Sequence, residues 1–187
     1  MTNIPNQSSD LPNNSPNSKN KPSISILPAK PSDSQWIEQS HARVFGPGRF
    51  ARAAFRVREN IPIDPSLSLI AKIDGQKVAS VIMTPISLCG VNGYLLGPLA
   101  TEIKSRGMGV GGLLVKQACA NVMKTGQAKF VLLVGDLSYY GAHGFERATL
   151  NAISFPAPLD QSRILIHCDD KSLLKSLNGL IKPWIKT

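Results

Sequence analysis

The chain has 187 residues, a formal net charge of +9 and 42% apolar residues, so it can bury one core and favours anionic partners. Three cysteines, Cys89, Cys119 and Cys168, stand far apart without a C-x-x-C pair, which excludes a disulfide framework or metal site and predicts buried reduced thiols. Without an apolar run of membrane length or a leader pattern, a soluble, cytoplasmic protein is expected.

The amino-terminal segment differs in composition from the rest of the chain. Residues 1–22 are rich in Asn, Ser, Pro and Lys and are predicted to form a disordered tail. Residues 23–187 are predicted to form one domain. This domain begins with an alternating strand at 23–27, followed by a helix that Ser32 or Asp33 can cap and by a second helix after a Gly-Pro-Gly segment.

An arginine cluster without an intervening acid falls on these two helices. Its members are Arg43, Arg49, Arg52, Arg56 and Arg58. On one continuous helix, Arg49, Arg52 and Arg56 would share a face opposite Phe50, so an ordinary solvated face explains them. The alternative is a surface that binds a phosphate, a carboxylate or a nucleic acid. Nucleic acid is disfavoured, because the cluster lacks the interleaved aromatic residues of RNA-binding surfaces.

Three extended runs follow, at residues 67–73, 77–88 and 94–100. The dipeptides Asp74-Gly75 and Asn92-Gly93 separate them, and both tolerate positive φ, so they predict hairpin turns and an antiparallel meander. Pro98 interrupts the third run. Proline in a strand is typical of a bulge or an edge.

The pattern then becomes helical, with apolar residues at every fourth position: Val110, Leu114, Ala118 and Val122. Gly126 is placed to end this helix. The apolar run at 129–134 predicts a strand covered on both faces and parallel to the strand at 94–100, which gives a βαβ crossover. The remaining predicted elements are a short helix near 138–143, strands around 145–154 and at 163–168, and a final helix capped by Asp169 or Asp170.

The stretch SRGMGVGG, residues 105–112, places four glycines at the start of the predicted helix. Glycine lacks Cβ, so main-chain amides can approach a phosphate, and the helix N-terminus adds a partial positive charge. A dinucleotide fingerprint would use Gly107, Gly109 and Gly112, with Asp136 as the ribose-binding acid. An R-x-x-G-x-G loop would use Arg106, Gly109 and Gly111.

The surrounding chain disfavours the first alternative. An antiparallel meander precedes the glycines and only 75 residues follow Gly112, too few for the further βα units of a dinucleotide domain. A P-loop is excluded because Leu113 and Leu114, rather than Lys-Ser/Thr, follow the glycines.

Three stretches, taken together and in this order, resemble the Gcn5-related N-acetyltransferases, particularly their small bacterial members. They are LLGPLATEIKSRGMGVGGLL (95–114), KFVLLVGD (129–136) and YYGAHGF (139–145), the last being similar to the family's Y-x-x-x-G-F. The resemblance covers roughly residues 23–155. It implies an α/β fold with a mixed sheet, in which an antiparallel meander precedes a βαβ crossover whose parallel strands splay apart. It also implies transfer of an acetyl group from acetyl-CoA to a primary amine by direct attack, without a metal.

The resemblance implies roles for particular residues. The glycine turn would bind the diphosphate of acetyl-CoA, and strand backbone would pair with the pantetheine arm. The cofactor-binding residues implied are Leu99, Ala100, Thr101, Arg106, Gly107, Met108, Gly109, Val110, Gly111 and Gly112. Tyr140, the first residue of Y-x-x-x-G-F, would be the general acid for the leaving thiolate, or else an aromatic side chain that only lines the cleft. Tyr139 is expected to pack elsewhere.

Other functional assignments stay open. Glu102, Asp136, His143 and Glu146 are candidate bases, but no spacing singles one out, and His41 and His167 have no visible partners. Cys119 is expected in the core. The resemblance implies that the acceptor is a small-molecule or peptide amine, and that the first two helices and the C-terminal segment shape the side on which it binds. Neither a membrane nor a nucleic acid is expected as partner. The alternatives are a catalytically silent CoA-binding module and a dinucleotide-binding oxidoreductase.

Overall fold

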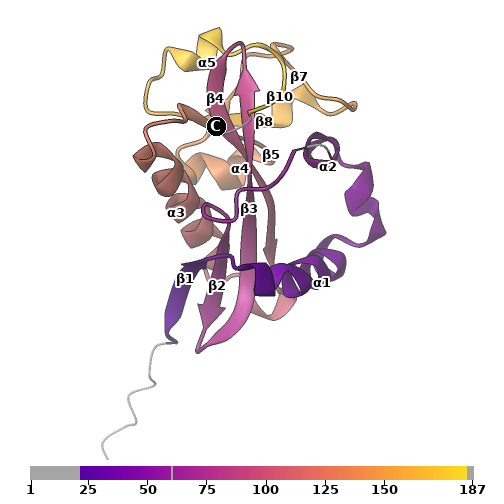
Figure 1. Cartoon of the computed structure of the whole chain (residues 1–187), viewed down its shortest axis with the longest axis vertical. Helices are drawn as coiled ribbons and strands as arrows, with labels where there is room; N and C mark the ends of the chain where they lie inside the picture. The colour runs from indigo at the N-terminus through magenta and orange to yellow at the C-terminus, as the bar shows by residue number, and fades with distance from the viewer. Residues whose placement is uncertain (1–21, 60, 185–187) are drawn as a thin grey trace, which may run out of the picture.

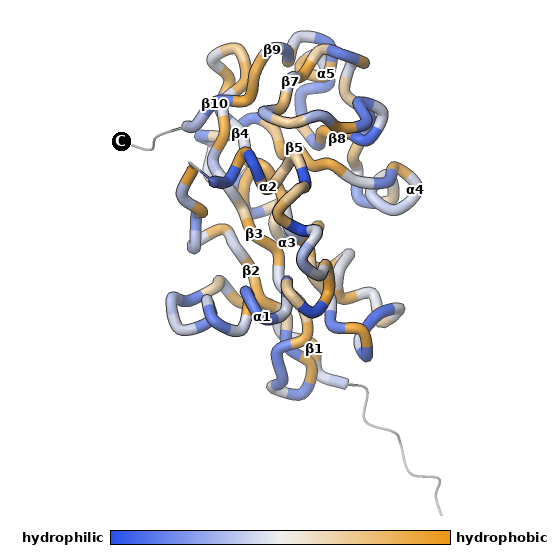
Figure 2. Tube along the Cα trace, turned by 90° about the vertical axis from the view of Figure 1, so that its right-hand side faces the viewer, coloured by the Kyte–Doolittle hydropathy of each residue, from blue (hydrophilic) through white to orange (hydrophobic). Residues whose placement is uncertain are grey.

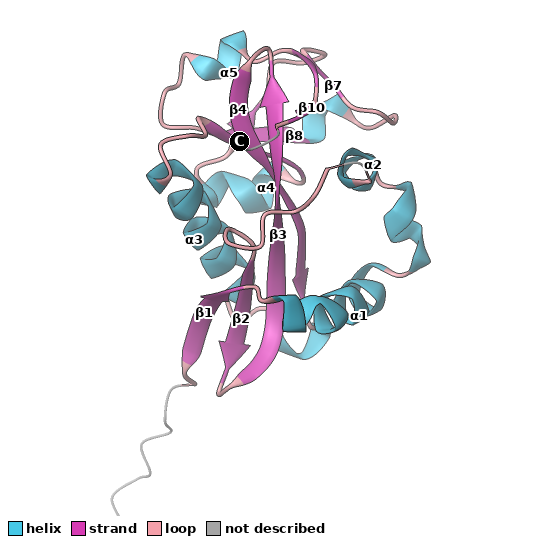
Figure 3. Cartoon of the chain, in the orientation of Figure 1, coloured by secondary structure: helices cyan, strands magenta, loops and turns pink. Residues whose placement is uncertain are grey.

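A computed structural model describes residues 22–59 and 61–184, built around one large sheet (Figures 1 and 3). The tail predicted for residues 1–22 lies outside the described residues apart from Pro22. The strand order is β1-β2-β3-β4-β5-β8-β6, with β10 also paired to β3. These strands are β1 Ile24–Pro28, β2 Leu69–Ile73, β3 Gln76–Leu88, β4 Val91–Thr101, β5 Phe130–Val134, β6 Glu146–Arg147, β8 Ile164–His167 and β10 Lys182–Pro183.

Two short strands, β7 (Ile153–Ser154) and β9 (Gly179–Leu180), form a separate parallel pair. The helices are α1 Ser34–Phe45, α2 Ala53–Arg58, α3 Val110–Lys124, α4 Leu137–Tyr140 and α5 Leu173–Ser176. In Figure 1, α3 covers one side of the sheet and α1 and α2 lie on the other. None of the helices in the described part of the chain combines the length and the apolar character needed to cross a membrane.

The predicted antiparallel meander is confirmed, but one of its two turns was placed wrongly. Asp74 and Gly75 join β2 to β3 with positive φ values of 48° and 81°. The turn between β3 and β4 is at Cys89 and Gly90, with φ values of 42° and 83°. Gly93 instead lies inside β4, where a Cβ atom would come within 2.5 Å of Cζ of the Phe130 ring, so the ring leaves room only for glycine.

The bulge predicted at Pro98 is confirmed by the strand register. Leu99 of β4 pairs with Val81 of β3, and Leu96 pairs with Met83, so β4 uses one residue more than β3 between these pairs. The parallel ladder between β4 and β5 joins residues 93–95 to residues 130–132, and both strands continue beyond it. The predicted βαβ crossover is therefore present, and its parallel strands separate next to the bulge.

Alternate residues of β5 face two different cores, as predicted for a strand covered on both faces. Val131 and Leu133 pack in the core that contains α3, whereas Phe130 and Leu132 pack in the core on the α2 side. In Figure 2 the hydrophobic colour follows β3 and β5 through the middle of the molecule. α3 begins at Val110 and is followed by Gly126 at a φ of 68°, which confirms the glycine at its end.

The buried residues of α1 are Ile37, Ser40 and His41, and Ile37 packs with Ile70 of β2 and Ile82 of β3. The imidazole Nε2 of His41 lies 3.3 Å from the hydroxyl of Ser80. At its other end α1 is tied to the residue that follows β4, because the Arg43 guanidinium donates to the carboxylate of Glu102 at 2.7 Å. These contacts fix the helix across β3 and β4.

Two predicted helices are shorter than expected. The segment after Gly46 is a 3-10 turn over Pro47–Ala51, then an extended residue, Arg52, and then α2, so its arginines do not share one helical face. The final helix is the single turn α5, preceded by an Asp170 carboxylate that accepts the Ser172 amide at 2.9 Å. The chain then turns into β9 and β10 because Gly179 takes a φ of 90°.

The three cysteines are all free thiols, but only two of them are buried. Cys119 lies in the core under α3, as predicted, and Cys168 is also buried. Cys89 is exposed, because it forms the turn between β3 and β4 rather than a strand interior.

Replacing Gly93 with alanine is expected to lower the free energy of unfolding by about 1–3 kcal/mol, because the new methyl group would collide with the buried Phe130 ring. Urea denaturation followed by circular dichroism measures the change. Gly48→Ala is the matched control, since no atom lies within 4 Å of its Cβ position. An equal effect of the two substitutions would contradict the packing described.

His41 is expected to make stability depend on pH. Burial lowers the pKa of its imidazole to about 4, below its ordinary value of 6.5, so the unfolded state binds more protons between these pH values. The free energy of unfolding should therefore decrease as the pH falls from 6.5 to 4, with His41 contributing roughly 3 kcal/mol of that loss. Denaturation of His41→Gln across this range should show a flatter profile. A slope parallel to the wild type would contradict this.

Candidate active site

The turn between β4 and α3 presents glycines to a cavity. Gly107 and Gly109 have positive φ values of 80° and 76°, and no atom lies within 4 Å of where their Cβ atoms would be. The carbonyl of Gly109 accepts the Leu113 amide at 3.1 Å, so α3 begins directly after Gly109. The amides of the first turn of α3 therefore lack partners within the helix and stand at the positive end of its dipole.

A cavity of about 490 Å³ opens over this turn. From the turn it is lined by Ser105, Arg106, Gly107, Gly109, Val110 and Gly111, and from the other side by Val44, Phe45, Leu99, Thr101 and Tyr139. Backbone amides without side chains, next to the exposed Arg106, suit a phosphate or a diphosphate.

The other predicted cofactor-binding residues lie outside this lining. Met108 is 44% exposed, and Ala100 is fully buried in β4. A Cβ atom on Gly112 would come within 2.7 Å of Cε1 of His143, so this glycine makes room for the imidazole ring. Gly111 faces the cavity, with Tyr139 Oη 2.8 Å from its Cβ position.

A second cavity, of about 450 Å³, lies where β4 and β5 separate. Its walls include Leu96, Gly97, Pro98 and Leu99 of β4, Leu133 and Val134 of β5, and Tyr140. Burial raises the pKa of Tyr140 to about 12, so its hydroxyl stays protonated at neutral pH and can donate a proton. The candidate general acid therefore lines the divergence between the strands.

The two adjacent tyrosines face different cavities. Tyr139 points away from the Tyr140 cavity, as predicted, but it lines the glycine-turn cavity and is 44% exposed, so it is not buried in packing. Its ring is perpendicular to that of Tyr140, with centroids 4.9 Å apart. Both belong to the single turn α4, in which successive side chains point about 100° apart.

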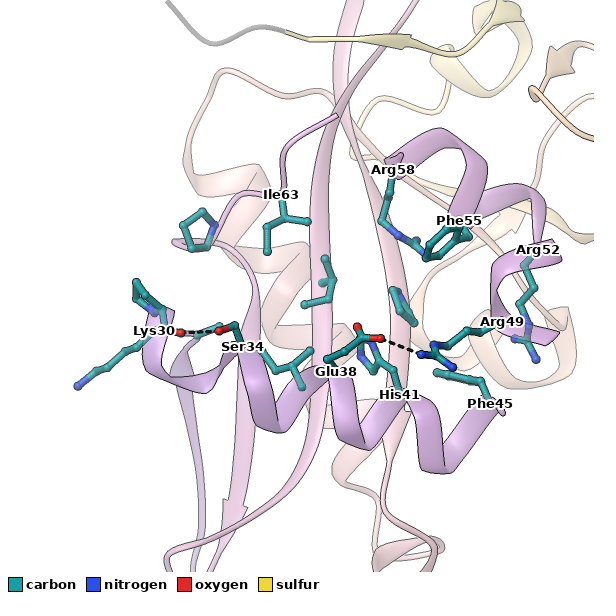
Figure 4. Close-up of a pocket in the computed structure, with 16 residues that line it drawn as sticks. Lys30, Ser34, Glu38, His41, Phe45, Arg49, Arg52, Phe55, Arg58 and Ile63 are labelled. Carbon is teal, nitrogen blue, oxygen red and sulfur yellow. Dashed lines mark hydrogen bonds and ion pairs between the residues drawn. The ribbon is translucent and has the colours of Figure 1, made fainter. Parts of the chain in front are cut away.

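A third cavity, of about 360 Å³, lies between α1 on one side and α2 with residues 61–65 on the other (Figure 4). Phe45 lines all three cavities, and Arg52, Arg58 and Pro98 line both the third cavity and the one between β4 and β5. The three cavities are therefore neighbours around the end of α1.

The candidate bases predicted from the sequence do not line these cavities. Glu102 pairs with Arg43, which holds the pKa of its carboxyl below the ordinary value. Asp136 pairs with Arg163 at 3.2 Å, and Glu146 pairs with Lys171 at 2.6 Å. The His143 ring lies over Gly112 and against Tyr139 at a centroid distance of 5.4 Å.

The titratable groups that do line the cavities include Glu38 and Asp160, which sequence reasoning missed, and His41, to which it gave no role. His41 has Ser80 as its neighbour, and His167 lies 3.1 Å from the carbonyl of Gly144. The i, i+4, i+8 spacing of Ile37, His41 and Phe45 was the available signal, since it places them on one face of α1. Asp160 lies in a loop without such a pattern.

The arginine cluster divides into paired and unpaired members. Arg43, Arg49 and Arg56 form ion pairs with Glu102, Glu38 and Glu59 respectively. Arg52 and Arg58 make no ion pair with any described acidic residue, and both line the cavities. The Arg58 guanidinium is half-buried and donates through Nη1 to the carbonyl of Gly97 at 2.7 Å.

Comparison with known proteins identifies relatives of the chain. It is 30% identical to the N-acetyltransferase YjhQ of Escherichia coli K12 over 131 residues, which cover 68% of this chain and 71% of YjhQ. It is 28% identical to the N-acetyltransferase YhbS of the same organism over 155 residues, which cover 81% of this chain and 91% of YhbS. No family model matches the sequence.

Solved structures share the fold. The GNAT family N-acetyltransferase YhbS from E. coli, determined in complex with CoA, matches with a TM-score of 0.68 and 24% identity over 87% of this chain and 89% of that one. A GNAT family acetyltransferase from Brucella melitensis, in complex with acetyl-CoA, matches with a TM-score of 0.59 and 23% identity over 79% and 89% of the two chains. Because its identity to YjhQ extends over more than two thirds of both sequences, the chain belongs to the GNAT family of N-acetyltransferases and is an acyltransferase.

Proposed function

We propose that the protein transfers an acetyl group from acetyl-CoA to a primary amine by direct attack. The observation that carries this proposal is the row of three adjoining cavities around Phe45. One suits a diphosphate, the next lies between diverging strands beside Tyr140, and the third is closed by α1 and α2. The relatives YhbS and the Brucella protein, whose structures contain CoA and acetyl-CoA, support the same cosubstrate.

Acetyl-CoA would lie across the first two cavities. Its diphosphate would bind the amides from Gly107 to Gly112, with Arg106 adding positive charge. Leu99, Ala100 and Thr101 use one edge of their backbone to pair with Val81, Ser80 and Ala79 of β3. Their other edge lies beyond the β4–β5 ladder, and it would hydrogen-bond to the pantetheine arm as an added strand would.

The reaction needs a neutral amine and a proton for the departing thiolate. The amine nitrogen bonds to the acetyl carbon, the carbon–sulfur bond breaks, and the hydroxyl of Tyr140 supplies the proton that the sulfur gains. The proton that the amine loses goes to water, and Tyr140 regains its proton from water. The predicted side-chain bases stand outside the cavities, Glu38 is paired with Arg49, and the pKa values of His41 and Asp160 are lowered. No covalent enzyme intermediate is required.

The test of this function is acetyl-CoA-dependent thiol release in the presence of a panel of amines, with Tyr140→Phe as the diagnostic variant. Loss of the proton donor should lower kcat by about 100-fold or more while the Kd for CoA is retained. Tyr139→Phe is the matched control, and it should retain a kcat close to that of the wild type. A larger loss of kcat in Tyr139→Phe than in Tyr140→Phe would show that Tyr140 is not the general acid. CoA binding without acetyl transfer to any amine would contradict the proposed function.

A pair of glycine substitutions distinguishes a role of the glycine turn in CoA binding from the general cost of alanine at a positive φ. Gly109→Ala and Gly126→Ala both place alanine at a positive φ with open space around it, at opposite ends of α3. Each should cost about 1 kcal/mol of stability in urea denaturation. Only Gly109→Ala should also weaken CoA binding, by about tenfold in isothermal titration calorimetry, because only Gly109 lines the cavity. If the Gly109→Ala and Gly126→Ala proteins bound CoA with equal affinity, the diphosphate would not bind at the glycine turn.

A further inference from the structure

The cavity beneath α1 has a largely apolar lining, which acetyl-CoA in the other two cavities leaves uncovered. Its apolar side chains include Ile37, Phe45, Phe55, Ile63 and Ile82. The volume of about 360 Å³ lies near the lower end of the range for small-molecule sites. The cavity therefore suits a compact acceptor with an apolar group.

Lys30 also lines this cavity, but its side chain extends away from it in Figure 4, and the other charged groups around the cavity are neutralised except at one end. Glu38 accepts from Arg49 at 2.8 Å, and Figure 4 shows this ion pair beside His41. The His41 imidazole is neutral at physiological pH because burial lowers its pKa to about 4. Arg52 and Arg58 have no acidic partner among the described residues, and they stand where this cavity meets the one between β4 and β5.

Arg58 is prepared to bind an anion. Its guanidinium is half-buried and held in place by the bond from Nη1 to the Gly97 carbonyl at 2.7 Å. An arginine has five N–H donors, so this bond leaves donors that no described residue engages. A carboxylate is the planar partner that such a fork accepts with two hydrogen bonds.

We propose that the acceptor is an α-amino acid with a large apolar side chain, an inference that rests on the acetyl transfer proposed above. The carboxylate binds Arg58, with Arg52 adding charge, and the apolar side chain fills the cavity beneath α1. Because the amine and the carboxylate share one carbon atom, the nitrogen then stands at the junction of the two cavities, beside Pro98. The products are the N-acetyl amino acid and the free thiol of CoA.

The same charges disfavour other amines. A polyamine or a lysine side chain would bring a second cation or no anion to Arg52 and Arg58. Of the described acids that line the two cavities, Glu38 is paired with Arg49, and Asp160 accepts hydrogen bonds from Ser162. An amino-acid amide or a decarboxylated amine would leave the half-buried guanidinium without its partner.

The experiment measures kcat/KM for L-phenylalanine, L-leucine and L-methionine against L-phenylalaninamide, phenethylamine, glycine, spermidine and a lysine peptide. L-Phenylalanine should be preferred over its amide by at least about tenfold. The amide has the less basic amine and so more neutral amine at a given pH. A preference for the acid therefore reports recognition of the carboxylate, not supply of the nucleophile.

Two variants test the two halves of the proposal. Arg58→Gln should lower the ratio of kcat/KM for the acid to that for the amide by about tenfold or more. Arg56→Gln is the matched control, because Arg56 lies two residues away on α2, pairs with Glu59 and lines none of the three cavities, so the ratio should not change. Ile63→Trp, at a side chain that is 47% exposed, should shift the preference from phenylalanine toward smaller side chains without disturbing the core.

The outcomes separate this inference from the function on which it rests. CoA affinity, measured for every variant, shows that the protein is folded and binds its cosubstrate. Acetylation of spermidine or the lysine peptide in preference to amino acids would overturn the acceptor and leave the transferase standing. Equal use of phenylalanine and its amide would do the same. Failure to bind CoA, or to release thiol with any amine, would overturn both proposals.

Discussion

The site depends on a backbone constraint, the extra residue that β4 accommodates at Gly97–Pro98. A bulge bends a strand and increases its twist. Here it follows directly after the residues that pair with β5, so β4 stays bonded to β3 on one edge while its other edge leaves β5. Hydrogen-bonding groups that a regular sheet would use internally are left beside a cavity. Without the bulge the same residues would continue the ladder, and the cavity between the strands would not open.

Phe45 connects this divergence to the rest of the site. It ends α1, and α1 is fixed to β3 by His41 and Ser80 and to the residue that follows β4 by Arg43 and Glu102. One aromatic ring therefore contributes to the wall over the glycine turn, the wall between the strands and the wall of the cavity beneath α1.

Local features could be predicted from the sequence, and long-range ones could not. The glycine turn, the strand after α3 and the bulge at Pro98 follow from residues close to one another in the chain. The turn at Cys89–Gly90 was missed because Asn92-Gly93 is the stronger local signal, and only the Phe130 ring, distant in sequence, explains Gly93 inside β4. The sequence also could not predict that Arg58 lacks an acidic partner among the described residues, because this depends on which acidic side chains the other arginines pair with in the folded chain.

The pairing of β10 with β3 also bears on how the protein behaves in solution. Along one edge, β3 pairs with β2 from Gln76 to Val81. Farther along the same edge, Ile86 and Ser87 of β3 pair with β10. An uncovered strand edge is a template on which other chains can assemble. A chain shortened before Lys182 would offer that stretch of β3 to a second molecule, so the last described segment protects the protein against aggregation.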